Sequence, residues 1–296
     1  MLLFEKRLIV GIDIGGSHIT AALIDLEKQC VLEESRVRSR VNSNGPAEEI
    51  ISTWVEVLRK VISGAPKGVS DLRLAMPGPF DYESGISLIK GMNKYESLYG
   101  LDIRSCLATH LAIVPENILF RNDAEAFLHG EVFCGAARTN NLAIGITLGT
   151  GLGSAVSIDG ITKDACLGVS AFKDGIAEDY ISTRWFVKRY HELTGKKIDG
   201  TEALVSLYQL EPAVKTIFAE FSSNLSVFLA SFIQSEQPEV VVIGGNIAKT
   251  HPLFLDEVKY KLSQYGLTTP LKIAELWESG ALLGAAYYSP AEKTIS

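Results

Sequence analysis

The chain lacks the features of a nucleic-acid-binding, secreted or membrane-spanning protein. Its 28 Lys and Arg residues are outnumbered by 35 Asp and Glu residues, for a formal net charge of -7, and they form no dense basic cluster. This balance repels a phosphate backbone. No apolar run approaches the ~20 residues that cross a bilayer, and residues 1–7 place charge directly after four apolar residues, unlike a secretory signal. We therefore expect a cytoplasmic protein with neither nucleic acid nor membrane as partner.

Cysteine and histidine show no metal-binding pattern. Cys30, Cys106, Cys134 and Cys166 are scattered and form no CxxC pair, so neither a zinc ribbon nor a disulfide framework is indicated, and we expect four buried thiols. The five histidines, His18 among them, have no metal-ligand spacing and are expected at the surface or in turns. Neither residue type predicts a metal centre.

The length and composition favour two domains with sizeable cores. The 296 residues exceed the usual size of a single core, and hydrophobic residues make up 47% of the chain against 21% charged ones. An internal duplication supports the same division, because residues 10–25 and 144–159 align without a gap at an offset of 134. Each copy predicts an apolar strand, a tight turn and a second strand. Each half of the chain therefore begins with the same hairpin.

Strands alternate with helices in both halves, which predicts α/β layers. Pro77 and Pro79 end one of the strands, because proline cannot donate to a ladder. The last helix is rich in small residues, which predicts close packing rather than chemistry. The expected strands are 31–38, 72–75, 118–120 and 240–243, and the expected helices are 46–62, a helix after 121–123, 213–234 and 279–288.

Two turns combine glycine with small hydroxyls. The first glycine turn is Gly15-Gly16-Ser17, and the second glycine turn is Gly149-Thr150-Gly151. Missing Cβ atoms let backbone N–H groups approach an anion closely. A single Gly-Gly hairpin turn is usually structural, but two matching turns in the two halves favour phosphate binding.

Three further features each allow a structural and a functional interpretation. Asp13 lies between two strand isoleucines, where it either caps the local turn or lies beside Mg²⁺, and we favour the Mg²⁺ role because a buried acid needs a partner or a metal. Asn122-Asp123 follows a strand at a helix start, where the pair either caps the helix or supplies a base and a sugar-binding amide. The third glycine turn, Gly244-Gly245-Asn246, either ends a core strand or forms a nucleotide edge.

In this order, these residues resemble the ROK family (repressor, open reading frame, kinase), which includes bacterial glucokinases and N-acetylhexosamine kinases. Residues 11–17 resemble its first phosphate motif, 148–153 its second, and 242–247 its adenosine-side motif. Pro77-Gly78-Pro79 resembles the Pro-Gly segment beside the sugar, and Asn122-Asp123-Ala124 matches the family's Asn-Asp-Ala. The resemblance implies a two-lobed, actin-like (ribonuclease H-like) ATPase fold with a mixed sheet in each lobe. We place the lobes at 1–120, completed by a C-terminal helix at about 279–296, and at 121–278, joined by tight crossings that can act as hinges.

The resemblance also implies roles for individual residues. Asp123 is the catalytic base, and Asp13 supports Mg²⁺ through water. Sugar contacts fall to Gly78, Asn122, Asp123 and Glu178. ATP contacts fall to Asp13, to the first two glycine turns for the phosphates, and to the third for adenosine: Gly15, Gly16, Ser17, Gly149, Thr150, Gly151, Gly244, Gly245 and Asn246.

One family segment is absent. The family's GExGH and CxCGxxGC elements have no counterpart in residues 164–175, so structural zinc is not expected. We expect ATP-dependent phosphorylation of a hexose hydroxyl, with Mg²⁺ and, as is common in the family, a homodimer. The alternative is an impaired kinase that only binds or senses sugar. A repressor is less favoured, since the first strand begins by about Leu8 and leaves no room for a helix-turn-helix ahead of it.

Overall fold

The computed structural model describes residues 8–65, 69–92 and 94–288, which form two compact units. The first unit takes the described residues up to Cys134 and those from Glu278 onward, and the second takes Gly135–Trp277. The chain therefore crosses between the units twice. The prediction put the first crossing after residue 120, whereas the structure keeps the last strand of the first sheet and the helix after it in the first unit.

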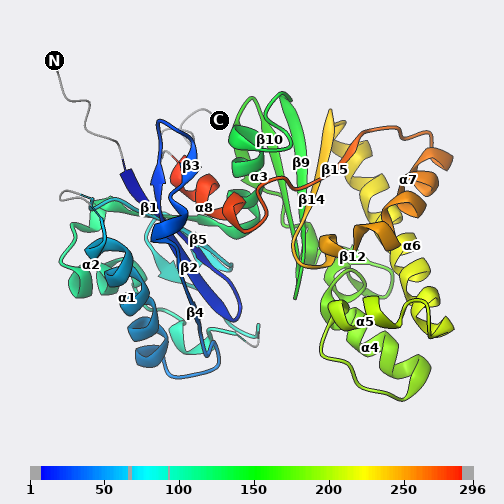
Figure 1. The fold of residues 1–296 in the computed structure, drawn as a ribbon, viewed down its shortest axis with the longest axis horizontal. Helices are drawn as coiled ribbons and strands as arrows, with labels where there is room; N and C mark the ends of the chain where they lie inside the picture. The colour runs from blue at the N-terminus through cyan, green and yellow to red at the C-terminus, as the bar shows by residue number, and fades with distance from the viewer. Residues whose placement is uncertain (1–7, 66–68, 93, 289–296) are drawn as a thin grey trace. The chain divides into compact units, whose positions relative to one another are not determined.

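The first unit is built on a six-stranded mixed sheet (Figure 1). Its order is β3-β2-β1-β5-β8, with β4 also paired to β2. The hairpin β1–β2 is antiparallel, whereas β5 and β8 run parallel to β1. The strands are β1 (Leu8–Ile14), β2 (His18–Asp25), β3 (Cys30–Val31), β4 (Val37–Arg40), β5 (Leu72–Met76) and β8 (Ile118–Asn122).

The strand predicted over 31–38 is two strands. A short 3-10 turn at Glu33–Ser35 separates β3 from β4, and both pair with β2. The Ser35 hydroxyl accepts from the Leu23 amide at 2.8 Å and donates to the Leu32 carbonyl at 2.6 Å. A serine side chain thus replaces one rung of the ladder, which the apolar pattern does not reveal.

The two faces of β1 meet different partners, because successive strand residues point to opposite faces. Ile12 and Ile14 belong to the core that includes Trp54 of α1 (Ala47–Ser63). Gly11 faces the other way, where a Cβ would lie 2.8 Å from the Leu282 carbonyl oxygen of α8 (Glu278–Ala286). Asp13 lies on this second face with Gly11.

Helices α3 (Asp123–Cys134) and α8 pack with their backbones in close approach. A Cβ on Gly284 would overlap the Ala126 carbonyl oxygen and lie 2.7 Å from the Gly130 nitrogen. Buried Arg121 ties the pair together, donating to the Gly284 carbonyl at 2.8 Å and to Glu125 at 2.7 Å. The small residues of the last helix therefore serve packing, as predicted. This helix ends at Ala286, and residues 289–296 lie outside the described part.

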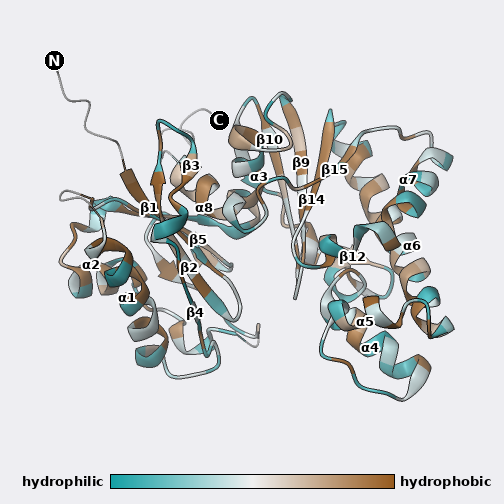
Figure 2. Ribbon diagram, in the orientation of Figure 1, coloured by the Kyte–Doolittle hydropathy of each residue, from teal (hydrophilic) through white to brown (hydrophobic). Residues whose placement is uncertain are grey.

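The second unit holds a five-stranded mixed sheet of order β11-β10-β9-β14-β15. Its centre is apolar: β14 is buried along its whole length and is brown in Figure 2. Helix α6 (Pro212–Glu236) is long and apolar enough to span a membrane, but 67% of its most apolar stretch is buried within the protein, as in a core helix. The strands are β9 (Leu142–Leu148), β10 (Leu152–Ile158), β11 (Ile161–Asp164), β14 (Val240–Gly244) and β15 (Leu271–Ile273).

The two duplicated hairpins differ in register by one residue. In the first, Ile14 pairs with Ile19, and four residues connect them. In the second, Leu148 pairs with Leu152, and three residues connect them. The turns close with different hydrogen bonds, Gly15 N to His18 O and Gly149 N to Gly151 O. A gapless alignment therefore conceals two different turns.

The remaining elements are shorter or lie outside the two sheets. The helices are α2 (Ile103–Leu111), α4 (Thr183–Thr194), α5 (Thr201–Leu207) and α7 (Leu255–Gln264), and two small hairpins are formed by β6 (Phe80–Asp81) with β7 (Ile86–Ser87) and by β12 (Ala171–Phe172) with β13 (Gly175–Ile176).

Two predictions about single residues are wrong. Cys166, in the turn after β11, is exposed rather than buried, and the other three thiols are only partly buried. His129 is fully buried on α3 rather than at the surface. Burial, followed by the charge of Arg121, lowers the pKa of His129, so this histidine is neutral and belongs to the core.

Candidate active site

Three carboxylates face one region of the first unit. Asp13 lies near the end of β1, Asp123 is the first residue of α3, and Glu278 is the first residue of α8. Burial raises the pKa of Asp13 to about 7, and the negative charges of Asp123 and Glu278 add to the effect. The guanidinium of Arg38, 2.7 Å from Glu278, opposes it. The structure thus brings together Asp13 and Asp123, the two acids singled out by sequence.

These carboxylates fit a hard divalent cation. Two carboxylates that raise the pKa of Asp13 make a region where a positive charge is favoured, and carboxylate oxygens are the ligands Mg²⁺ takes from proteins. Among the described residues, no group of three or more His, Cys, Asp or Glu side chains is placed to hold a metal by itself. Mg²⁺ would therefore need oxygens from a bound phosphate and from water besides Asp13.

Asn122 is held in place by both ends of its amide. Its Oδ1 accepts from the amides of Ala124 and Glu125 at 2.8 and 3.0 Å, which caps α3. Its Nδ2 donates to the Tyr82 hydroxyl at 3.2 Å. The helix-capping interpretation of Asn122 is therefore correct, and one N–H of its amide stays available for a ligand.

Gly78 lies beside this amide. A Cβ on Gly78 would lie 3.2 Å from the Tyr82 hydroxyl and 4.0 Å from Asn122 Nδ2. The Tyr82 hydroxyl in turn donates to the Met76 carbonyl at 3.0 Å. Gly78, Asn122 and Asp123 are thus close neighbours, as their common assignment to the sugar requires.

The first glycine turn is anchored from below and open at its tip. The Tyr95 hydroxyl donates to the Gly15 carbonyl at 2.6 Å, and the Val41 amide donates to the Ser17 carbonyl at 2.8 Å. Gly16 and Ser17 are exposed, and a Cβ on Gly15 or Gly16 would come no closer than 3.6 Å to any neighbour. The fold therefore has room for a Cβ at both positions. Glycine here instead allows a ligand to approach the backbone closely.

The second glycine turn lies against Glu178. A Cβ on Gly151 would lie 2.6 Å from the Glu178 carboxylate, which also accepts from the Leu152 amide at 3.4 Å. Arg184 pairs with the same carboxylate. Gly149 has nothing within 4 Å of a Cβ position, so this part of the turn is open. Glu178 thus contacts the turn, a neighbour that sequence alone did not assign to it.

The third glycine turn lies beside the second. Strand β14 runs parallel to β9, so both strands end at the same edge of the sheet. Gly245 has a φ of +86°, and a Cβ on it would lie 2.7 Å from the nitrogen of Leu148, the residue before the second turn. The second unit therefore brings together the two turns and Glu178, and Thr150 and Asn246 are exposed at this edge.

Sequence analysis did not identify four residues of the first unit that lie beside the candidate site or support it. Tyr95 supports the first glycine turn from the core, and Tyr82 orients Asn122. Lys94 lies over the turn, with its Cδ 3.9 Å from a Cβ position on Gly16. Arg40 lies opposite His18 in the β2–β4 ladder. Their separation in sequence from the motifs left no local signal; only the basic pair Arg38 and Arg40, at strand spacing, could have drawn notice.

The segment without the zinc motif is closed by its own contacts. In the hairpin β12–β13, Lys173 Nζ donates to Asn224 Oδ1 of α6 at 2.6 Å and lies 4.7 Å from the centre of the Tyr180 ring. Tyr180 also donates to Asp174. The first contact ties the hairpin to α6, and the other two link residues within 173–180.

Comparison with known proteins places this arrangement in a class. The structure matches that of a ROK family glucokinase from Streptomyces griseus in complex with glucose and AMPPNP, with a TM-score of 0.77 and 21% identity over 94% of this chain and 98% of that chain. The predicted fold class is therefore confirmed: an α/β protein with two mixed sheets, of the actin-like ATPase type.

The chain belongs to the ROK family, whose model matches residues 9–171 and 173–292. It is 22% identical to the glucokinase of Thermotoga maritima, over 95% of this chain and 96% of that one. It is 23% identical to the xylose repressor of Bacillus subtilis, over 96% of this chain and 78% of the repressor. Its relatives thus include both sugar kinases and repressors.

Proposed function

We propose that this protein is an ATP-dependent sugar kinase that phosphorylates a hydroxyl of a neutral hexose. The observation that carries the proposal is the proximity of Asp13 and Asp123 in the first unit, where each meets a separate need of phosphoryl transfer. A protein that only binds sugar needs neither a metal carboxylate nor a base. The ligands of the Streptomyces griseus glucokinase, glucose and AMPPNP, support the same choice.

In the proposed mechanism Asp123 accepts the proton of the sugar hydroxyl as its oxygen attacks the γ-phosphorus. The new O–P bond forms while the bond from the γ-phosphorus to the bridging oxygen breaks, and ADP leaves with that electron pair. Asn122 and Gly78 position the sugar. Mg²⁺, when bound beside Asp13, neutralises phosphate charge. The first and second glycine turns hold the phosphates through backbone N–H groups, and the third contacts adenosine.

The protein is further proposed to act in the cytoplasm as a homodimer, with ATP and Mg²⁺ as its cofactors and without structural zinc. The second candidate function is regulation by sugar binding without phosphorylation. The relationship to the xylose repressor of Bacillus subtilis supports it.

The function is tested by sugar-dependent ADP release with Mg-ATP across a panel of neutral hexoses and N-acetylhexosamines. We expect one sugar to give turnover well above the sugar-free rate. If no sugar does so while one of them binds in calorimetry, the kinase proposal is wrong and the regulatory function stands.

Glu178 is expected to act on the sugar rather than on the phosphates. Glu178→Gln keeps the side-chain shape and an oxygen for the Leu152 amide, but it removes the charge that faces Arg184. We expect the KM for sugar to rise about tenfold, the effect of losing one charge-assisted hydrogen bond, with little change in the KM for ATP. A rise confined to ATP would instead make Glu178 a support of the second glycine turn.

Asp13 is expected to destabilise the ligand-free protein at neutral pH. Its pKa is raised from 3.8 to about 7 on folding, so the unfolded chain loses this proton first, and stability falls as pH rises between these values. Asp13→Asn removes the penalty. Without ligand, we expect the variant to be more stable than the wild type by a margin that grows from about pH 4 to about pH 7 and is then constant. Urea unfolding across this range measures the margin, and equal stabilities near pH 8 would contradict the burial argument.

A further inference from the structure

A row of basic side chains lies on one face of the strand pair β2–β4. In the antiparallel register His18 pairs with Arg40 and Thr20 pairs with Arg38. Residues directly opposite each other share a face, and so do residues two apart. His18, Arg38 and Arg40 therefore point to the same side of the sheet. Asp13 also pairs with Thr20, so this is the face that carries the candidate active site.

The positive charge of this row is only partly balanced. Arg38 is paired with Glu278 at 2.7 Å. Arg40 is exposed, and no carboxylate of the described residues lies within ion-pair distance of its guanidinium. Burial, followed by the charges of Arg38 and Arg40, lowers the pKa of His18, with Glu278 opposing them, so His18 is largely neutral and Arg40 carries the unbalanced charge of the row. An anion beside Arg40 would balance this charge.

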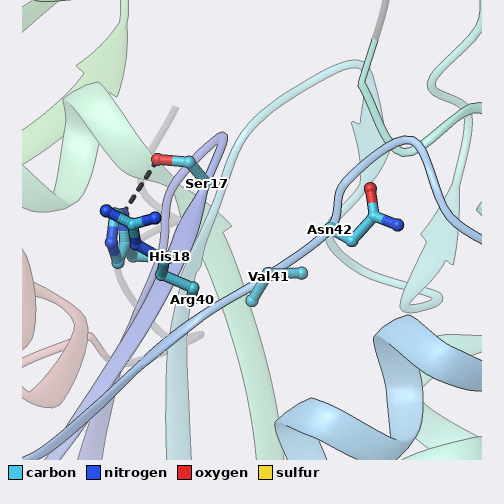
Figure 3. A pocket seen from close by; sticks show the side chains of 5 residues that line it. All are labelled: Ser17, His18, Arg40, Val41 and Asn42. Atoms are coloured by element: carbon cyan, nitrogen blue, oxygen red, sulfur yellow. Dashed lines mark hydrogen bonds between the residues drawn. The ribbon is translucent and has the colours of Figure 1, made fainter.

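A pocket opens at the unbalanced end of the row. Figure 3 shows Ser17, His18, Arg40, Val41 and Asn42 lining it, and its volume is about 460 Å³. Ser17 Oγ is 2.9 Å from His18 Nδ1, and Asn42 Nδ2 donates to Glu49 at 3.4 Å. The lining residues include a hydroxyl, an imidazole, a guanidinium and an amide, and none of the five is a carboxylate. Such donors suit phosphate oxygens.

We propose that this pocket is a second phosphate-group site, beside the first glycine turn, in which Arg40 is the principal cation. It extends the proposed function in one respect, because Ser17 belongs both to the turn proposed to hold nucleotide phosphates and to the pocket. The ligand is a phosphate group carried either by a linear phosphate chain that continues past the turn or by free orthophosphate.

The test is calorimetric binding of tripolyphosphate and, separately, of orthophosphate, without metal ion, nucleotide or sugar. Arg40→Gln removes the charge and retains most of the side chain's length. Arg138→Gln is the matched control, because Arg138 is also exposed, has no side-chain partner among the described residues, and changes the net charge by the same amount. Both side chains are exposed, so we expect both variants to unfold at the wild-type temperature.

The wild type is expected to bind tripolyphosphate, Arg40→Gln to bind it about tenfold more weakly, and Arg138→Gln to bind it like the wild type. If orthophosphate binding is weakened in the same way, the site takes a single free phosphate. If only tripolyphosphate binding is weakened, the site holds the end of a chain. Equal binding by Arg40→Gln and Arg138→Gln, or no binding by the wild type, would overturn the proposal.

This outcome is separable from that of the kinase assay. Binding is measured without ATP or sugar, so a protein without turnover can still have the phosphate-group site. Conversely, sugar-dependent ADP release in the wild type with unaltered tripolyphosphate binding in Arg40→Gln would retain the kinase and remove the site.

Discussion

Replacing Asp123 with Asn is expected to lower the rate of sugar-dependent ADP release by a factor on the order of 10² to 10⁴, the usual contribution of a positioned general base. The amide cannot accept the hydroxyl proton. It does keep an oxygen in the place of the Oδ1 that accepts from the Ala124 amide at 2.8 Å, so the start of α3 should remain intact. Single-turnover kinetics at saturating sugar and Mg-ATP measures the loss.

A second readout distinguishes this role from a general disturbance. The charge of Asp123 raises the pKa of Asp13, so Asp123→Asn should lower the pKa of Asp13. We therefore expect nucleotide binding in the presence of Mg²⁺ to survive, and to persist to a lower pH than in the wild type. Glu116→Gln, at an exposed carboxylate of the same unit, is the matched control and should leave both turnover and binding unchanged. Near-normal turnover of Asp123→Asn would refute the mechanism.

The largest expected effect on stability comes from Gly284. In Gly284→Ala the new methyl group would overlap the Ala126 carbonyl and lie 2.7 Å from the Gly130 nitrogen, and both are backbone atoms of α3 that cannot rotate away. The helices must separate, which also strains the bond from Arg121 to the Gly284 carbonyl. We expect a loss of about 3 kcal/mol in the free energy of unfolding, at the upper end of overpacking effects. Urea unfolding measures this loss.

Gly64→Ala is the control, because Gly64 ends α1 with a φ of -84° and a Cβ there would come no closer than 3.7 Å to its neighbours. Its stability should change by less than about 1 kcal/mol. A similarly small change in Gly284→Ala would show that α3 and α8 can move apart freely. It would also mean that the close packing of α3 against α8 is not needed to position Asp123 and Glu278 at the starts of the two helices.

Part of the site could be predicted because its signals are local in the chain. Glycine beside a hydroxyl in a turn, or an acid between apolar strand residues, is visible in a few consecutive letters. The two glycine turns, Asp13 and Asp123 were found in this way, and the order of these motifs predicted the fold class. Their roles in catalysis remain predictions.

Other parts could not be predicted because they depend on contacts between distant segments. The hydrogen bond from Tyr95 to Gly15 joins residues 80 apart in the chain, and no sequence pattern near either residue predicts it. The alignment of the two hairpins likewise gave no sign of their different registers, since register is decided by the partner strand and the turn hydrogen bonds.

The sequence by itself determined the alternation of strands and helices, the duplicated hairpins and the positions of the motifs, because side-chain periodicity and turn chemistry act over a few residues. The return of the last helix to the first lobe was predicted from the family resemblance, but tertiary structure alone decided that α8 brings Glu278 to the face of Asp13 and Asp123. It also decided that Arg40 faces His18 beside Ser17. The physical reason is that burial and the distances between charges exist only once strands and helices have packed. They set the pKa of Asp13, and they decide that no carboxylate of the described residues pairs with Arg40.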